Sequence, residues 1–235
     1  MRYLVACDER WGPIISAHDV PTTFCAGYSG SGESPYFHSL LKTIIHQQLG
    51  IKAAKTIEGR VMTALKLKPG AFATPTAVSR AKWSTRSEGG KQKVTLNGAV
   101  PGLSHQKAAY IQSLAASFSS GGGLCGVNLD SLSDADLCEK LTQVKGIGQW
   151  SSEMFLMFRM RRQDVFSPGD LILRQGTAQF VGKPKDAFRK TNKKTFAAAS
   201  EIAANWSPYR SLASAYLWKS KDSRSASSGV EKLKK

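Results

Sequence analysis

Apolar residues recur at the spacing of an α-helix along most of this 235-residue chain. In the stretch SPYFHSLLKTIIHQQLG, residues 34–50, the apolar side chains fall on one helical face, and Gly50 is a suitable helix stop. Residues 83–102 are polar and glycine-rich and form either a long loop or a short hairpin. The same periodicity predicts further helices at 3–18 and 51–67, from Ser104, from Ser133, at 149–162, from about Asp170, at 193–205 and at 207–219.

The order of these helices predicts an all-α chain without repeats or a strong linker. We expect one helical domain over residues 1–219, built as two lobes with a cleft between them. From Ser220 onward the sequence is polar and basic, so residues 220–235 are expected to be a disordered tail.

The charge of the chain is strongly unbalanced, with 33 Lys and Arg against 17 Asp and Glu and a formal net charge of +16. Such an excess favours a polyanionic partner, and the alternative is a basic surface that only aids solubility. Basic segments at residues 82–93 and 183–194 and in the tail can add phosphate contacts. No apolar run is long enough for a membrane span, and acidic residues interrupt the N-terminal segment where a secretory signal would be apolar. We expect an intracellular protein that does not bind membranes.

Four cysteines, Cys7, Cys25, Cys125 and Cys138, are scattered along the chain. No two are spaced as C-x-x-C, and they do not form the close cluster that holds an iron–sulfur centre. The simplest interpretation is four buried structural thiols in a reducing compartment.

A Gly-x-Gly turn lies in LTQVKGIGQWSSEMFLMF, residues 141–158, where Gly146 and Gly148 flank Ile147 between two predicted helices. The pattern is that of a helix–hairpin–helix motif, over about residues 133–158. Glycines permit positive φ and close approach of another backbone, and the following helix presents free N–H groups that suit a phosphate oxygen. The alternative is an ordinary tight turn between packed helices.

Asp170 follows the chain-breaking pair Pro168-Gly169 and precedes the apolar pattern that begins at Leu171. This is the position of an N-cap, and capping alone is the alternative to a functional role. A helix N-terminus also favours a negative charge, and a carboxylate held there can stabilise positive charge in a nearby transition state.

Five motifs together give a more specific indication: IIHQQLGIKAA (44–54), GLSHQKAAYIQSLA (102–115), LTQVKGIGQWSSEMFLMF (141–158), DVFSPGDLILRQG (164–176) and WSPYRSLASAYLWK (206–219). In this order the chain resembles the helix–hairpin–helix DNA glycosylase superfamily, and most closely its alkylpurine branch, the 3-methyladenine DNA glycosylases. The resemblance covers roughly residues 35–220. The short segment before it resembles the compact, yeast-like form, without the N-terminal β domain of larger bacterial members.

The resemblance implies a role for several residues. Asp170 matches the catalytic aspartate, although Gly169 stands where the family often has another acid. Leu49 matches the wedge that fills the gap left by an extruded base, and Gly50 stands where a polar contact is common. The matching base-pocket residues are Trp150, Met154 and Trp218, and the matching DNA-binding residues are Gln48, Leu49, Gly146, Gly148 and Gln149. For the leucine and the tryptophans, burial in the core is the alternative.

The motif resembles family hairpins that hold a monovalent cation through backbone carbonyls, here those of Thr142, Val144 and Ile147; no other cofactor is expected. Members with lyase activity carry a nucleophilic lysine where this chain has Trp150, so no Schiff base can form at that position.

The resemblance therefore implies a monofunctional DNA glycosylase that flips out 3-methyladenine or 7-methylguanine and leaves an abasic site for base excision repair. Its partner would be double-stranded DNA with alkylated bases, bound by a monomer in the nucleus of a eukaryote or otherwise in the cytoplasm or nucleoid. The alternatives are a DNA-damage binding protein without catalysis, and a glycosylase for uracil, mismatched thymine or hypoxanthine.

Overall fold

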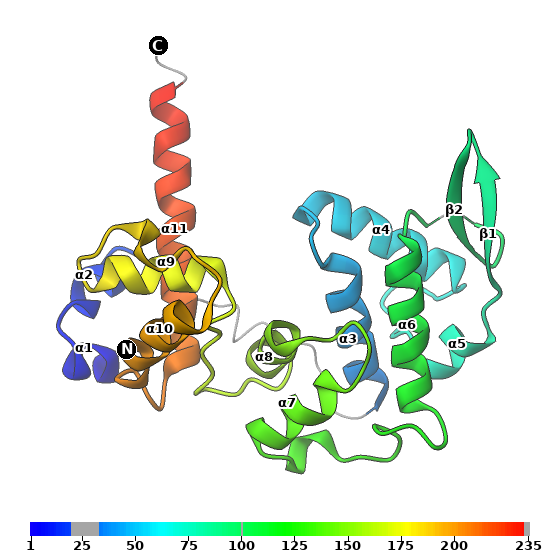
Figure 1. Cartoon of the computed structure of the whole chain (residues 1–235), viewed down its shortest axis with the longest axis horizontal. Helices are drawn as coiled ribbons and strands as arrows, with labels where there is room; N and C mark the ends of the chain where they lie inside the picture. Colours follow the sequence, from blue (N-terminus) through cyan, green and yellow to red (C-terminus); the bar gives the residue numbers. More distant parts are fainter. Residues whose placement is uncertain (20–32, 100, 233–235) are drawn as a thin grey trace. The chain divides into compact units, whose positions relative to one another are not determined.

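Helices provide most of the regular structure in the computed structural model, which describes residues 1–19, 33–99 and 101–232 (Figure 1). The chain divides into two compact units. Unit 1 comprises the described parts of Met1–Gly27 and Leu156–Lys235, and unit 2 comprises those of Tyr28–Phe155. Among the described residues, no helix is both long and apolar enough to span a membrane.

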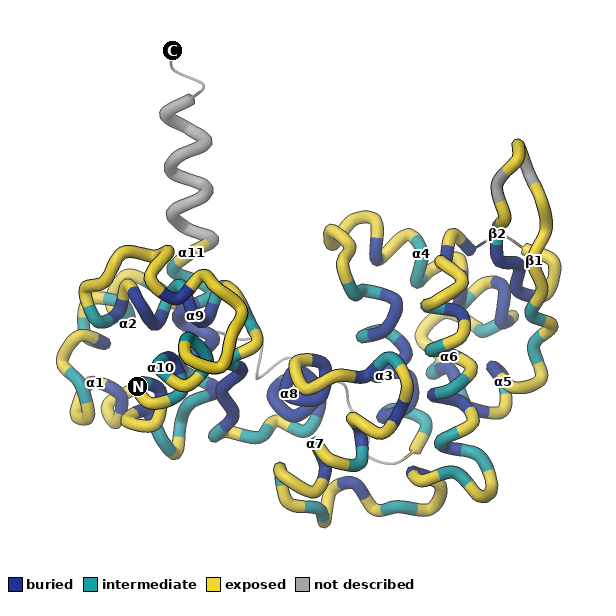
Figure 2. The backbone as a smooth tube through the Cα atoms, in the orientation of Figure 1, coloured by how far each residue is buried: buried dark blue, intermediate teal, exposed yellow. Residues whose placement is uncertain are grey.

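Unit 2 is built around α3 (Glu33–His46), which packs against α4 (Ile51–Ala64) and α6 (His105–Phe118), while α5 (Pro75–Arg80) packs on α6. The apolar face predicted for α3 is confirmed, and its residues form part of the buried core in Figure 2. The side chains of this face that are wholly inaccessible to solvent are Phe37, Leu40, Leu41, Ile44 and Ile45. The unit continues with the 3-10 turn η2 (Leu129–Ser131), α7 (Asp134–Thr142) and most of α8 (Gln149–Phe158).

Of the two alternatives for the polar segment after α5, a long loop or a short hairpin, the structure has the hairpin. Strands β1 (Trp83–Glu88) and β2 (Lys91–Leu96) pair antiparallel, with Trp83 opposite Leu96. The two-residue turn is Gly89-Gly90, at φ of 56° and 72°, a conformation that glycine adopts without steric cost.

Unit 1 is formed by α1 (Arg2–Cys7) and α2 (Trp11–Ser16) from one end of the chain. The other end adds α9 (Leu171–Phe180), the 3-10 turn η3 (Lys185–Phe188), α10 (Lys193–Ala204) and α11 (Arg210–Lys232). Its core is centred on Trp206, which is fully buried and packs edge-to-face against Trp11 and Phe180 with ring centroids 5.2 Å away in both pairs.

Several predicted boundaries were wrong. The single helix expected at 3–18 is two, because the Asp8 carboxylate accepts the backbone N–H of Arg10 at 3.0 Å and so competes with helix continuation. Gly50 does not stop α3, which ends at His46; it is instead the N-cap of α4. Helix α5 was missed, since it is only six residues long.

At the C-terminal end, α11 extends from Arg210 to Lys232 and so includes most of the segment from Ser220 that was expected to be a disordered tail. No proline interrupts this segment, so the backbone can continue the helix that starts at Arg210.

The prediction of buried cysteines was wrong for two positions. Cys7 and Cys125 are exposed, whereas Cys138 is partly buried, and burial raises its pKa to about 11. Cys25 lies outside the described residues. Composition alone could not place these thiols, because their burial depends on helix ends and loops that the sequence pattern fixes poorly.

Candidate functional site

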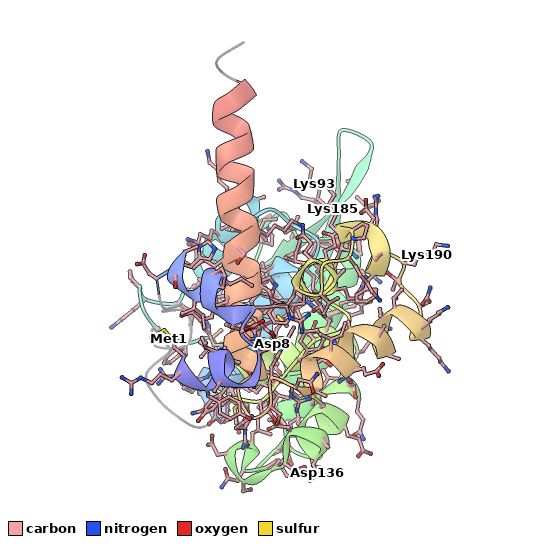
Figure 3. All side chains as sticks on the ribbon, turned by 90° about the vertical axis from the view of Figure 1, so that its left-hand side faces the viewer. Met1, Asp8, Lys93, Asp136, Lys185 and Lys190 are labelled. Carbon is pink, nitrogen blue, oxygen red and sulfur yellow. The ribbon has the colours of Figure 1, made fainter. Side chains whose placement is uncertain are left out.

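The helix–hairpin–helix prediction is met locally by α7, a short turn and α8. Ser133 caps α7 as predicted, with its hydroxyl oxygen accepting the backbone N–H of Asp136 at 3.1 Å. Asp136 is labelled on α7 in Figure 3. Residues 143–148 form what we call the Gly-x-Gly turn, in which the N–H of Ile147 donates to the carbonyl of Val144 at 2.9 Å. The Gly148 carbonyl then accepts the N–H of Ser152 at 3.0 Å, as the first bond of α8.

The two glycines of this turn are used differently. Gly146 has a φ of 96°, and a Cβ built on it would lie 2.2 Å from Cγ of Tyr110, so no side chain fits there. The expectation of positive φ was wrong for Gly148, which is exposed and would have nothing within 4 Å of an added Cβ. The first glycine therefore serves packing within the protein, and the second leaves open space above the start of α8.

The Gly-x-Gly turn lies against the chain between α3 and α4. The Gln47 side chain donates from Nε2 to the Gly146 carbonyl at 2.9 Å and to Oγ of Ser151 at 3.3 Å. The Lys107 ammonium donates to the carbonyls of Ile45 and Gln47 at 2.6 and 2.7 Å. Burial lowers the pKa of this lysine, because desolvation disfavours its charged form.

One depression of about 440 Å³ joins many of the predicted residues of unit 2. Its lining includes three of the five predicted DNA-binding residues, Gln48, Gly146 and Gly148, but not Leu49 or Gln149. It also includes the three residues whose carbonyls were candidates for a cation, Thr142, Val144 and Ile147. The structure thus places residues that are about a hundred positions apart in the sequence around one surface feature.

Residues 47–50, which we call the wedge loop, carry the predicted wedge. Gln48 adopts a φ of 56°, and Leu49 after it is 37% exposed. Ile51, the first residue of α4, is 76% exposed and was missed by the sequence interpretation. No signal in the sequence indicated this exposure, because Ile51 lies three residues before the buried Ala54 and so continues the apolar pattern of α4. Two adjacent exposed aliphatic side chains are suited to contact an apolar ligand surface such as stacked bases.

In unit 1, the structure brings two predicted residues together. Asp170 is the N-cap of α9, and its Oδ1 accepts the backbone N–H of Leu173 at 2.9 Å. The indole Nε1–H of Trp218, from α11, donates to the same oxygen at 3.3 Å. Phe158 stacks on Trp218, with ring centroids 5.6 Å apart and an interplanar angle of 28°. Phe158 was not singled out from the sequence, because it continues the apolar run of α8.

The remaining predicted pocket residues lie on the part of α8 that belongs to unit 2. Trp150 is 40% exposed, and Met154, one turn later, is 8% exposed. Residues four apart share a helical face, so Trp150, Met154 and Phe158 form one row along this helix. Gln149 donates from its side chain to Oε1 of Glu153 at 2.9 Å. Met154 is therefore buried, whereas the side chain of Trp150 remains accessible.

A buried arginine supports the loop that carries Asp170. Arg174 is 1% exposed, and it donates from Nη1 to the Pro168 carbonyl at 2.7 Å and from Nε to the Phe188 carbonyl at 3.0 Å. Burial lowers its pKa, while the charge of Asp170 acts in the opposite direction. The sequence interpretation missed this residue, although an arginine within the apolar pattern one turn after Asp170 was a usable signal.

A second polar cluster joins the last two motifs of the sequence. The Asp164 carboxylate accepts hydrogen bonds from Nε and Nη2 of Arg210 at 2.7 and 3.0 Å and from Oγ of Ser207 at 2.7 Å. Burial acts to raise the pKa of Asp164, but these hydrogen bonds outweigh it, so the pKa lies below its usual value. The cluster connects the segment before Asp170 with the start of α11, the helix that carries Trp218.

No model of a known protein family matches the chain. DNA-3-methyladenine glycosylase 1 of Schizosaccharomyces pombe is 30% identical to it over 217 residues, which cover 92% of this chain and 84% of that protein. The crystal structure of DNA-3-methyladenine glycosidase from Bacillus halodurans is similar with a TM-score of 0.64 and 32% identity, covering 93% of this chain and 87% of that chain.

The 3-methyladenine DNA glycosylase of Schizosaccharomyces pombe, in complex with abasic DNA, is similar with a TM-score of 0.65 and 26% identity. The match covers 94% of this chain and 95% of that chain. The shared helical fold confirms the fold class predicted from the sequence.

Proposed function

This chain belongs to the 3-methyladenine DNA glycosylases of the helix–hairpin–helix superfamily, and from that premise we propose that it excises alkylated purines from duplex DNA. It hydrolyses the N-glycosidic bond of bases such as 3-methyladenine and 7-methylguanine and leaves an abasic site for base excision repair. The observation that carries the proposal is the Asp170 carboxylate, which is fixed by a helix N-terminus and by the indole of Trp218.

The chemistry that we propose for Asp170 is electrostatic. Alkylation at N3 or N7 makes the purine cationic, so it leaves the sugar with little general-acid assistance. Positive charge then develops on the sugar, and the carboxylate stabilises it and orients the attacking water. The hydrogen bonds from Leu173 and Trp218 support this role, because a carboxylate held by two donors needs little reorganisation during the reaction.

The base must leave the stack before this chemistry, because its glycosidic bond is inaccessible inside the duplex. We propose that Leu49 fills the space that the base vacates, which is supported by its exposure beside Ile51. A cationic base is attracted to aromatic faces, and the partly exposed Trp150 and the stacked pair Trp218 and Phe158 supply them.

The Gly-x-Gly turn is proposed to bind a backbone phosphate. Support comes from the open space over Gly148 and from the start of α8 immediately after it, whose N–H groups and dipole favour an anion. Phosphate contacts carry no sequence information, which suits an enzyme that must find damage anywhere. Exposed lysines between α9 and α10, including Lys185 and Lys190 in Figure 3, can add further phosphate contacts.

A monovalent cation bound by the carbonyls of Thr142, Val144 and Ile147 is also proposed. Support for this proposal comes from the place of all three residues in the lining of one depression. The Val144 carbonyl already accepts the N–H of Ile147, so a cation would use its second lone pair. A bound cation would neutralise part of the charge of a phosphate at the turn. Comparing duplex affinity in potassium and in tetramethylammonium salts at equal ionic strength tests this proposal.

We further propose that the enzyme acts without lyase activity, as a monomer, in the compartment that holds the DNA. The position after Gln149 is Trp150, which has no amine to attack the sugar. Light scattering with and without duplex tests the monomeric state.

The decisive experiment is release of free base from methylated duplex by the wild-type protein and by Asp170→Asn. Asparagine is as good an N-cap as aspartate, so the variant should fold, and thermal unfolding checks this. We expect its excision rate to fall by about a hundredfold or more, with duplex binding retained. Binding of damaged duplex without base release by the wild type would favour the non-catalytic alternative. A substrate panel with uracil, mismatched thymine and hypoxanthine tests the other alternative.

A further inference from the structure

The wedge loop begins at the end of a helix whose last carbonyls need donors. Lys107, which enters from the first turn of α6, supplies them through its two hydrogen bonds to the carbonyls of Ile45 and Gln47. Bonds from an ammonium are stronger than those between neutral groups, and partial burial shields these from water. His46, the last residue of α3, also bonds Glu58 of α4 at 2.8 Å. The loop is therefore held at its start from two helices.

The next contact joins the wedge loop to the Gly-x-Gly turn. Gln47 accepts from Lys107 through its backbone and donates through its side chain to the carbonyl of Gly146 and to Ser151. One residue thus connects the ammonium on α6 to the turn and to the first turn of α8. Lys107 and Gln47, which together connect α6 to the Gly-x-Gly turn, are both partly buried. The connection therefore does not pass through a fully solvent-exposed side chain.

After Gln47 the chain makes a turn that is unfavourable by itself. A side-chain-bearing residue with the φ of Gln48, 56°, costs about 1–2 kcal/mol. Such a conformation persists only where surrounding contacts fix it. Here these contacts are the hydrogen bonds from Lys107 to the carbonyls of Ile45 and Gln47, on the N-terminal side of Gln48. This turn sets the direction in which Leu49 leaves the protein surface.

We propose that Lys107 and Gln47 are positioning residues that fix the wedge loop to the Gly-x-Gly turn, so that a phosphate held at the turn sets the depth of Leu49 in the duplex. The proposal rests on the function proposed above and adds a separate step to it. The two residues act on base extrusion, whereas Asp170 acts on bond cleavage and Gly148 on phosphate affinity. Their loss should therefore matter only where a paired base must be removed from the stack.

The test compares two substrates that differ in the cost of extrusion. In the first, 7-methylguanine lies opposite cytosine; in the second, it lies opposite an abasic-site analogue, so no base pair has to break. Single-turnover excision at saturating protein is measured on both, together with affinity for undamaged duplex. The variants are Lys107→Met and Gln47→Met, which keep side-chain length and remove the donors.

Matched controls come from the same unit. Lys68→Met removes an exposed ammonium that bonds no carbonyl among the described residues, and Gln112→Met removes an amide whose bond within the same part of the chain is to the Ala108 carbonyl of α6. We expect both controls to excise from both substrates like the wild type. Lys107→Met and Gln47→Met should lose about tenfold on the paired lesion and less than about threefold on the unpaired one, as expected for one or two lost hydrogen bonds. Lys107→Arg, which can still donate to both carbonyls, should recover most of the paired activity.

Equal losses on the two substrates, or unchanged excision of the paired lesion by folded variants, would overturn the coupling. Circular dichroism melts establish folding, and if Lys107→Met unfolds, Gln47→Met decides the question alone. A wild-type protein that releases no base from either substrate would refute the proposed function, which is a different result. Weaker binding of undamaged duplex with normal excision at saturation would assign both residues to phosphate affinity and also overturn the proposal.

Discussion

Substituting each glycine of the Gly-x-Gly turn by alanine should give two very different proteins. At Gly146, alanine must adopt a φ of 96°, and its Cβ would lie 2.2 Å from Cγ of Tyr110. Backbone strain of about 1–3 kcal/mol adds to a steric term of about 1–3 kcal/mol, because the Tyr110 ring has to move away. At Gly148, alanine meets nothing within 4 Å and costs only about 0.5–1 kcal/mol as a poorer N-cap.

The assay is urea unfolding of both variants beside the wild type, with the free energy of unfolding taken from the linear extrapolation. We expect a loss of about 2–6 kcal/mol for Gly146→Ala and less than about 1 kcal/mol for Gly148→Ala. A double variant with Tyr110→Gly, compared with Tyr110→Gly alone, separates the two terms at Gly146, because it removes the overlap with the whole Tyr110 side chain but not the strain of positive φ. Equal stability of the two single variants would refute the assignment of Gly146 to packing against α6.

A larger side chain at Gly148 tests DNA binding separately from folding. Gly148→Val places a branched side chain in the open space over the start of α8, so it should weaken binding of damaged and undamaged duplex alike. Single-turnover excision at saturating protein should fall much less than for Asp170→Asn, since the reacting groups are untouched. Unchanged duplex affinity in a folded Gly148→Val protein would mean that no phosphate binds at this turn.

Three further outcomes are expected. Trp218→Phe keeps an aromatic ring but removes the donor to Asp170, so the excision rate should fall by about tenfold with little change in duplex affinity. An excision rate equal to wild type would show that this hydrogen bond does not contribute to excision. Abasic product should stay uncleaved until alkali is added, and a covalent protein–DNA adduct trapped with borohydride would contradict the absence of lyase chemistry at Trp150. Asp164→Asn should lower the Tm at pH 7, because the folded pKa of Asp164 lies below the usual 3.8 and its ionised form therefore stabilises the fold above that pH. The Tm difference from wild type should shrink as the pH falls through the folded pKa. A Tm difference that does not change with pH would exclude the charge of Asp164 as its cause.

Features that depend on near neighbours along the chain are predictable from the amino-acid sequence. Helical periodicity predicted the buried face of α3, and side-chain chemistry predicted Ser104, Ser133 and Asp170 as N-caps, all three of which are confirmed. These features could be predicted because a cap bonds an N–H two or three residues away and a helical face repeats every three or four residues. The Gly-x-Gly turn was recognised for the same reason, although the sequence could not distinguish the roles of its two glycines.

Which of these local features lie together depends on the tertiary structure. The Trp218 indole bonds Asp170 from 48 positions away, and Lys107 bonds the end of α3 from 62 and 60 positions away. Gln47 and Gly146 are 99 positions apart. No periodicity or propensity encodes such pairs, because they depend on how helices pack and on where the chain between them returns. The sequence therefore predicted the capping carboxylate of Asp170 and the Gly-x-Gly turn, whereas packing alone selected the residues that hold them.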